Sequence, residues 1–172
     1  MFSDPAINLS KLGLADGMKV VDLGAGSGFY AIEAARRVGN SGRVYAVDVQ
    51  KDLLERLRNQ AVSAGINNIE VVWGNAEKVG GTKIREGIAD RVIASNILFQ
   101  VENPNEFALE VKRVLKPGGK ALVVDWSEVS PLGPRVPFPA MKAQMLFEKI
   151  GFKLDQPFGA GEHHYGLVMT RA

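Results

Sequence analysis

Three glycines at alternate positions, Gly24, Gly26 and Gly28, stand between a short apolar run and a stretch with helical periodicity. Glycine permits the positive φ angles that such a corner needs, and its missing Cβ lets a ligand approach the backbone. In an α/β sheet the corner lies at the carboxyl end of a strand, where nucleotide-sized ligands bind. Residues 20–30 therefore predict a ligand pocket built around the turn Gly24, Ala25, Gly26, Ser27 and Gly28.

Two acidic side chains belong to the same predicted pocket. Asp22 stands two residues before Gly24, and a carboxylate there attracts a cationic amino group but repels a pyrophosphate. Asp48 follows Gly28 by twenty residues and, with Val49, ends the next apolar run. That is the place of an acid that accepts hydrogen bonds from ribose hydroxyls. Taken alone, Asp48 is also compatible with a solvated acid that caps the following helix.

A third group of polar residues, Asn75, Ala76 and Glu77, follows the third apolar run. The amide of Asn75 can both donate to and accept from the edge of an adenine ring. Asn75 is also a common turn residue, so a purely structural role stays open. Together the ends of the first three strands offer groups for an amino acid, a ribose and a base.

The glycine spacing separates two classes of nucleotide-binding protein. A dinucleotide fingerprint has the form Gly-x-Gly-x-x-Gly, whereas residues 24–28 read Gly-x-Gly-x-Gly. This spacing disfavours an oxidoreductase that uses NAD. A non-catalytic binding or assembly protein, in which the glycines serve only helix packing, stays open as an alternative.

The elements that must position these residues alternate along the chain. Apolar runs predict strands at 18–23, 43–49, 69–73, 90–95 and 120–126, and helical periodicity predicts helices at 8–14, 28–38, 52–64, 104–115 and 139–150. Residues 96–101 and the proline-rich stretch 130–139 are expected to be loops. The last two strands, 152–158 and 165–171, form a hairpin. The pattern predicts one domain over residues 1–172, a doubly wound, Rossmann-like α/β fold with helices on both faces of a mostly parallel sheet.

Residues 20–28, 44–48, 74–77, 90–96 and 114–122, read together and in this order, resemble the class I S-adenosylmethionine-dependent methyltransferases. The similarity is closest to the small-molecule branch that includes quinone-biosynthesis enzymes. It implies a seven-stranded sheet of order 3-2-1-4-5-7-6 with strand 7 antiparallel, in agreement with the hairpin. It also implies S-adenosylmethionine as cofactor, S-adenosylhomocysteine as product and methyl transfer to a small organic acceptor.

The resemblance implies a role for each candidate position. The glycine turn receives the methionine end of the cofactor, with Asp22 near its amino group and Asp48 on the ribose. Asn75 and Ala76 lie at the adenine, where many relatives have Asp in place of Asn75. Asn96, just past the fourth strand, lies under the sulfonium.

Methyl transfer from a sulfonium is an in-line displacement, and a base is needed only when the acceptor must lose a proton. His163 and His164, beside Glu162 in the hairpin turn, are the candidate bases; the alternative is that they are exposed turn residues. Two neighbouring histidines are too few for a metal site, and none is predicted. Phe99, Gln100, Trp126 and the 130–139 loop with Arg135 are expected on the acceptor side, with core packing as the alternative for Phe99 and Trp126.

Composition limits the partners. The 21 basic and 19 acidic residues give a net charge of +2, and there is no dense basic tract, so no nucleic-acid partner is expected. The absence of cysteine excludes disulfides and thiol chemistry. No apolar run reaches the ~20 residues of a membrane span, and a cytoplasmic protein is expected. The segment before the first strand is short, so the pocket is expected to be open or completed by a second subunit in a homodimer.

Overall fold

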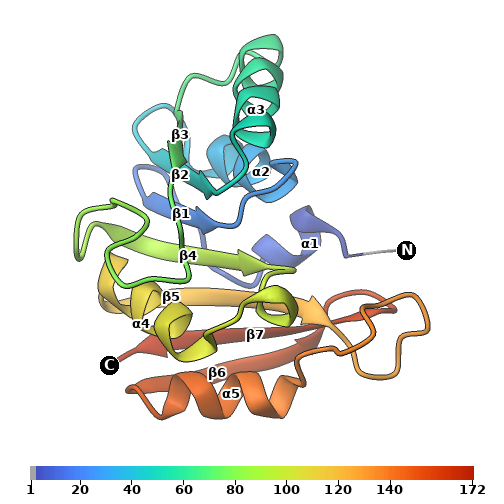
Figure 1. Cartoon of the computed structure of the whole chain (residues 1–172). Helices are drawn as coiled ribbons and strands as arrows, with labels where there is room; N and C mark the ends of the chain where they lie inside the picture. The colour runs from blue at the N-terminus through green and yellow to red at the C-terminus, as the bar shows by residue number, and fades with distance from the viewer. Residues whose placement is uncertain (1–2) are drawn as a thin grey trace.

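The fold is built on one mixed sheet, seen in a computed structural model that describes residues 3–172. The sheet has the strand order β3-β2-β1-β4-β5-β7-β6, so the predicted order is confirmed (Figure 1). Strand β7 runs antiparallel to both of its neighbours, β5 and β6, while the other pairs are parallel. The strands are β1 (Lys19–Leu23), β2 (Arg43–Asp48), β3 (Ile69–Trp73), β4 (Ala89–Ser95), β5 (Leu115–Trp126), β6 (Phe152–Gly159) and β7 (His164–Arg171).

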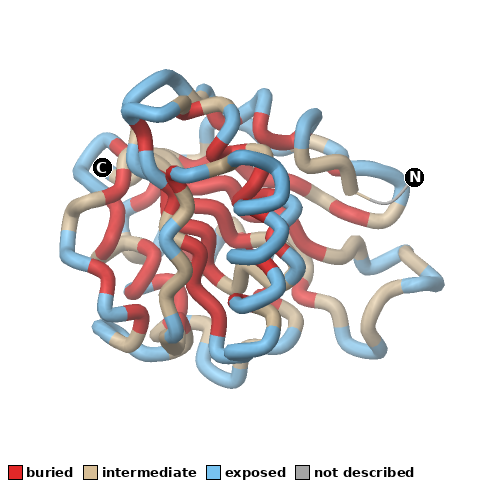
Figure 2. The backbone as a smooth tube through the Cα atoms, turned by 90° about the horizontal axis from the view of Figure 1, so that it is seen from above, coloured by how far each residue is buried: buried red, intermediate tan, exposed pale blue. Residues whose placement is uncertain are grey.

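Helices cover both faces of the sheet, as predicted. The helices are α1 (Pro5–Leu9), α2 (Phe29–Val38), α3 (Lys51–Ser63), α4 (Pro104–Val114) and α5 (Ala140–Glu148), with a short 3-10 turn η1 (Leu98–Gln100). Side chains alternate along a strand, so neighbouring residues enter different cores. Val20 packs with α1, α2 and α3, whereas Val21 packs with α4 and α5. Figure 2 shows the resulting buried strands inside a shell of exposed helix surfaces and loops. Within the described residues, no helix has both the length and the apolar character that crossing a membrane requires.

The register of the parallel strands brings their carboxyl ends to one edge. Leu23 at the end of β1 lies between Val47 of β2 and Ala94 of β4. The residues that follow these three positions are therefore neighbours in space, although the sequence separates them by more than twenty residues. This edge holds the candidate site.

The first helix differs from the predicted 8–14 segment. It spans Pro5–Leu9, because Asp4 caps it and its carboxylate accepts a 2.9 Å hydrogen bond from the Ala6 amide. Proline at the first helical position also suits a helix start. Leu12, which the prediction placed inside the helix, lies in the turn that follows it and is still fully buried, in the core next to α1 and α2.

Two further boundaries differ from the predictions. Strand β5 begins at Leu115 rather than 120, because Leu115 pairs with Ala89 across a register shift. The 96–101 segment contains η1 rather than being wholly irregular. Its start is held by Asp125, whose carboxylate accepts a 2.8 Å hydrogen bond from the Leu98 amide.

The glycine at the start of α2 allows a test of how tightly α2 and α3 pack. Gly28 has φ +84°, and a Cβ built on it lies 2.1 Å from Cδ1 of Leu57, a fully buried side chain of α3. Gly28→Ala is expected to lower the free energy of unfolding in urea by about 3 kcal/mol. Roughly 1–2 kcal/mol of this comes from backbone strain and the rest from overpacking.

Gly65→Ala is the matched control, since Gly65 also has a positive φ, +70°, but nothing lies within 4 Å of its added Cβ. It should lose only the strain of about 1–2 kcal/mol. Equal losses in the two variants would mean that the Gly28–Leu57 contact does not limit packing.

Candidate functional site

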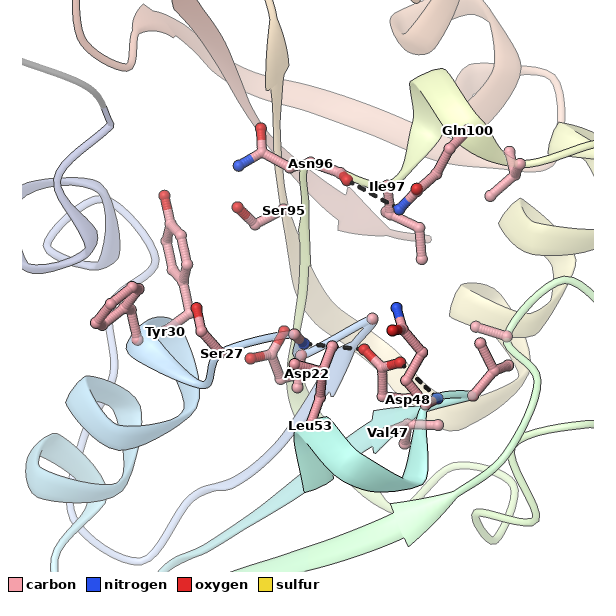
Figure 3. Close-up of a pocket in the computed structure, with 18 of the residues that line it drawn as sticks. Asp22, Ser27, Tyr30, Val47, Asp48, Leu53, Ser95, Asn96, Ile97 and Gln100 are labelled. Carbon is pink, nitrogen blue, oxygen red and sulfur yellow. Dashed lines mark hydrogen bonds between the residues drawn. The ribbon is translucent and has the colours of Figure 1, made fainter. Parts of the chain in front are cut away.

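A cavity of about 590 Å³ opens at the carboxyl edge of the sheet, a volume suited to a cofactor-sized ligand. All of the predicted cofactor-binding residues except Gly28 line it: Asp22, Gly24, Ala25, Gly26, Ser27, Asp48, Val49, Asn75, Ala76, Glu77 and Asn96. In Figure 3, Asp22, Ser27 and Asp48 lie on one side of the space, and Ser95 and Asn96 lie across from them. Gly28 instead begins α2 and faces Leu57, outside the cavity wall.

The glycine turn is hydrogen-bonded to the end of β2. The amides of Gly24 and Ala25 both donate to the carbonyl oxygen of Val47, at 2.8 and 2.9 Å. The amide of Gly26 donates to a carboxylate oxygen of Asp48 at 2.9 Å. The turn is thus fixed against its neighbouring strand before any ligand arrives.

Asp22 is the most unusual group in the cavity. It lies inside β1 with 1% of its surface exposed, and its Oδ2 has no hydrogen-bond partner. Burial, and next the negative charge of Asp48, raise the pKa of Asp22 to about 7. A buried carboxylate without a counter-charge is unfavourable, so this position fits a ligand that brings a cation.

Asp48 is bound on both of its oxygens. Besides the Gly26 amide, it accepts a 2.9 Å hydrogen bond from the amide of Gln50, at the start of α3. Each carboxylate oxygen can accept a further hydrogen bond, because it has two lone pairs. Asp48 therefore orders the turn and keeps acceptor capacity for ligand hydroxyls.

The loop that follows β3 is held in place by hydrogen bonds within the loop and by others from α4. The amide oxygen of Asn75 accepts from the Glu77 amide at 2.9 Å, so both the predicted turn role and the cavity position hold for Asn75. Farther along the loop, buried Glu110 of α4 accepts from the Gly80 amide at 2.7 Å and pairs with Arg113 at 2.7 Å. Burial would raise the pKa of Glu110, but these hydrogen bonds lower it below its usual value.

The opposite end of the cavity is formed by strands β4, β5 and β7. Asn96 follows β4 with φ +53°, and its side-chain oxygen lies 2.9 Å from Nε2 of His164. The His164 ring lies against Trp126, with centroids 4.3 Å apart and an interplanar angle of 36°. All three residues line the cavity.

The two candidate histidines occupy different environments. His164 is 5% exposed and is the first residue of β7, so the idea that it is an exposed turn residue is wrong. His163 does not line the cavity; its Nδ1 lies 3.1 Å from Oγ of Ser130. The difference arises because His163 is still in the turn before β7, whereas His164 is the first residue of the strand and pairs with Trp126 of β5.

Of the other predicted acceptor residues, Gln100 lines the cavity but Phe99 and Arg135 do not. Gln100 lines the cavity, and its side-chain nitrogen donates to the Asn96 carbonyl oxygen at 3.3 Å. Phe99 packs against the core, which was the alternative role considered for it. Arg135 is exposed and does not line the cavity.

The sequence did not predict one wall of the cavity, which is formed by the first described residues together with the start of α2. Ser3, Pro5, Phe29 and Tyr30 line the cavity there. The Tyr30 hydroxyl lies 2.8 Å from Nδ2 of Asn8 and 2.9 Å from Oγ of Ser3. No local pattern marks these residues, because the contacts join α1 to α2 across more than twenty positions. Within residues 3–172, no group of three His, Asp or Glu side chains is placed to hold a metal ion.

Comparison with known proteins agrees with this geometry. Residues 14–153 match a protein-family model described as a methyltransferase domain. The chain is 33% identical over 143 residues to the ubiquinone/menaquinone biosynthesis C-methyltransferase UbiE of Laribacter hongkongensis, covering 83% of this chain and 57% of that protein. For the protein of the same name from Bordetella avium the identity is 32% over 130 residues, covering 75% and 49%. The chain thus spans about half the length of these curated relatives.

Solved structures extend the similarity over the whole sheet. A SAM-dependent methyltransferase from Aquifex aeolicus superimposes with a TM-score of 0.88 at 25% identity, covering 99% of this chain and 91% of that one. A geranyl diphosphate C-methyltransferase from Streptomyces coelicolor, in complex with Mg²⁺, geranyl diphosphate and S-adenosyl-L-homocysteine, has a TM-score of 0.79 at 15% identity. It covers 97% of this chain and 78% of that one, and at this identity the likeness concerns the fold alone. The chain therefore belongs to the class I S-adenosylmethionine-dependent methyltransferases, and the curated proteins that it resembles are named for quinone biosynthesis.

Proposed function

We propose that the protein binds S-adenosylmethionine in this cavity and transfers its methyl group to a small organic acceptor. The observation that carries the proposal is the buried Asp22 carboxylate, whose Oδ2 has no partner in the protein. The cofactor has an ammonium group at its methionine end, and this cation would supply the missing partner. The glycine turn beside Asp22 leaves room for that end of the molecule.

The other cavity residues fit the rest of the cofactor. Asp48 would accept hydrogen bonds from the ribose hydroxyls with the lone pairs that the backbone leaves free. Asn75 and Ala76 would lie at the adenine, and Asn96 under the sulfonium. The charged residues Asp22, Asp48 and Glu77 that line the cavity are all acidic, which supports a cationic ligand over the diphosphate of NAD.

When bound, S-adenosylmethionine supplies a methyl group activated by a sulfonium, and the sulfur leaves as a neutral thioether. The protein's own task is then to align the acceptor with the methyl group and to exclude water. Ser95, Asn96, Trp126 and His164 would perform it, because they line the end of the cavity opposite the Asp22 side. A proton that the acceptor loses would pass to solvent or to a base at this end.

For the acceptor we propose a small phenol or hydroquinone. The curated relatives are named as C-methyltransferases of ubiquinone and menaquinone biosynthesis, and such rings are electron-rich at carbon. The aromatic face of Trp126 beside two polar side chains suits a ring of that kind. A non-catalytic binding protein with the same fold is the second candidate, since the chain spans only about half of those relatives.

We also propose that residues 1–172 act as one domain, in the cytoplasm, without a nucleic-acid partner. The continuous sheet supports a single domain, and the net charge of +2 supports the absence of a nucleic-acid partner. A homodimer would close the open side of the cavity, and it too is a proposal.

Calorimetric titration tests cofactor binding directly. S-adenosylhomocysteine, which keeps the ammonium, ribose and adenine, is expected to bind in the micromolar range, whereas NADH should give no heat of binding. In Asp48→Ala the affinity should fall by about tenfold or more, because hydrogen bonds to a charged acceptor contribute about 1.5–3 kcal/mol each.

Asp52→Ala is the control for Asp48→Ala, since Asp52 is an exposed acid in the first turn of α3. Its affinity for S-adenosylhomocysteine should equal that of the wild type. Binding of NADH alone, or of neither ligand, would reject the proposed cofactor, and unchanged affinity in Asp48→Ala would reject the ribose position.

Asp22→Asn tests the unpaired carboxylate through stability. A raised pKa in the folded state favours the protonated acid, so the wild type loses stability as pH rises from about 4 through 7. Relative to the wild type, Asp22→Asn should therefore gain on the order of 2 kcal/mol in unfolding free energy at pH 8, and little at pH 4. It should also bind S-adenosylhomocysteine more weakly, because the ammonium loses its counter-charge. A variant that is less stable than the wild type at pH 8 would contradict the assignment.

Transfer of labelled methyl groups tests the acceptor class. With tritiated S-adenosylmethionine under reducing conditions, hydroquinone and a naphthohydroquinone are expected to gain label, whereas aniline and thiophenol should not. Preferential labelling of aniline or thiophenol would reject the phenol class. Cofactor binding without transfer to any of the four would support the non-catalytic candidate.

A further inference from the structure

The acceptor end of the cavity contains a hydrogen-bonded pair that the proposed function does not by itself require. Asn96 Oδ1 and His164 Nε2 lie 2.9 Å apart, and the His164 ring rests against Trp126. Trp126 and His164 are directly opposite each other in the antiparallel β5–β7 ladder. The main-chain amide of Asn96 also donates to the Val124 carbonyl oxygen of β5 at 2.8 Å. Three strands of the sheet therefore hold the pair in place.

The protonation of His164 follows from its surroundings. Burial, and next the nearby His163, lower the pKa of His164, so its ring is neutral at pH 7 and carries one N–H. An amide oxygen can only accept, and the proton must therefore be on Nε2, where it donates to Asn96. Nδ1 is then unprotonated, and it is a buried hydrogen-bond acceptor without a donor in the protein. Such a group lowers stability, so packing alone does not explain a histidine here.

The pair leaves the Asn96 amide nitrogen as a free donor. With Oδ1 bound by His164, Nδ2 makes no hydrogen bond within residues 3–172. Figure 3 shows the Asn96 amide and the Ser95 hydroxyl extending from the end of β4 toward the Tyr30 side of the cavity. Asn96 has φ +53°, a left-handed conformation that Asn tolerates and that turns its side chain out of the strand pattern.

The donors around this end favour an oxygen as their partner, while the charges of the cavity mean that an anionic oxygen there needs the positive charge of the cofactor. Neither lysine nor arginine lines the cavity within the described residues, and its carboxylates belong to Asp22, Asp48 and Glu77. The Asn96 amide and the Ser95 hydroxyl, which extend from the end of β4, are neutral donors. Two convergent neutral donors suit the oxygen of a phenolate or enolate, whose charge the cationic cofactor would balance.

We infer that His164 is a positioning residue that orients Asn96, so that Asn96 Nδ2 and Ser95 Oγ bind an anionic acceptor oxygen next to the reacting atom. This rests on the proposed methyl transfer and specifies its acceptor as an oxyanion. The phenol proton leaves to solvent, and the phenolate electron pair forms the new bond to the methyl carbon through oxygen or the ortho carbon. The C–S bond breaks with its electron pair on sulfur. After attack by carbon, the ring hydrogen leaves as a proton and aromaticity returns.

The test uses para-nitrophenol as an absorbing probe for the oxyanion site. Its phenolate absorbs visible light and its phenol does not, so binding of the anion lowers the apparent pKa of the probe. With protein saturated by sinefungin, a cofactor analogue that carries an ammonium group in place of the sulfonium, the wild type is expected to bind the phenolate and lower that pKa. The same titration without protein gives the reference value.

Four variants separate positioning from a purely structural role. His164→Phe keeps a ring against Trp126 but removes the donor, and should weaken phenolate binding at least tenfold while S-adenosylhomocysteine binds within twofold of wild type. His164→Gln restores an N–H donor and should recover part of the phenolate affinity. Asn96→Asp keeps the left-handed backbone and the acceptor for His164 but loses the amide donors, and should abolish phenolate binding. His163→Phe is the neighbouring control and should behave as wild type.

The outcomes distinguish this inference from the proposed function. Wild-type phenolate affinity in His164→Phe, equal loss in His164→Phe and His163→Phe, or no recovery in His164→Gln would overturn the positioning role. Wild type that binds sinefungin but not the phenolate would overturn the oxyanion site while leaving methyl transfer intact. Wild type that does not bind S-adenosylhomocysteine would overturn both.

Discussion

The turn after β1 is held against the end of β2 by three backbone donors. Two of them, from Gly24 and Ala25, reach the Val47 carbonyl oxygen, and the third, from Gly26, reaches the Asp48 carboxylate. The same carboxylate binds the Gln50 amide at the start of α3, so one side chain fixes both the turn and the next helix. The floor of the cavity therefore depends on Asp48 before any ligand contacts it.

This arrangement has an electrostatic cost at Asp22. The two carboxylates face the same cavity, and burial together with the charge of Asp48 keeps the Asp22 pKa near 7. Among the described residues, buried polar atoms without a partner occur on Asp22, His164 and Arg171, and the first two line the cavity. Native proteins satisfy nearly all such atoms, so their concentration here indicates that the interior is prepared for a ligand. The unpaired atoms of Asp22 and His164 therefore lower the stability of the folded protein at positions where a ligand would contact them.

The sequence was sufficient for the features that depend on local patterns. The alternation of strands and helices, the glycine turn and the position of Asp48 all follow from periodicity and spacing within short windows. The features that depend on pairing between distant segments could not be found this way. His164 looked like a turn residue because its burial comes from Trp126 and Asn96, which lie 38 and 68 positions away. Tyr30 was missed for the same reason, since its cavity position depends on α1.

The reversed direction of β7 explains how the proposed acceptor end of the cavity is built. In a wholly parallel sheet the start of a strand lies at the edge opposite the ligand cavity. Because β7 is antiparallel to β5, its first residue, His164, meets the last residue of β5, Trp126, at the carboxyl edge. The end of the cavity that we propose for the cofactor is formed by β1, β2 and β3, and the end that we propose for the acceptor by β4, β5 and β7. Substitutions in the β6–β7 hairpin can therefore change the acceptor surface while the hydrogen bonds that hold the glycine turn to β2 stay intact.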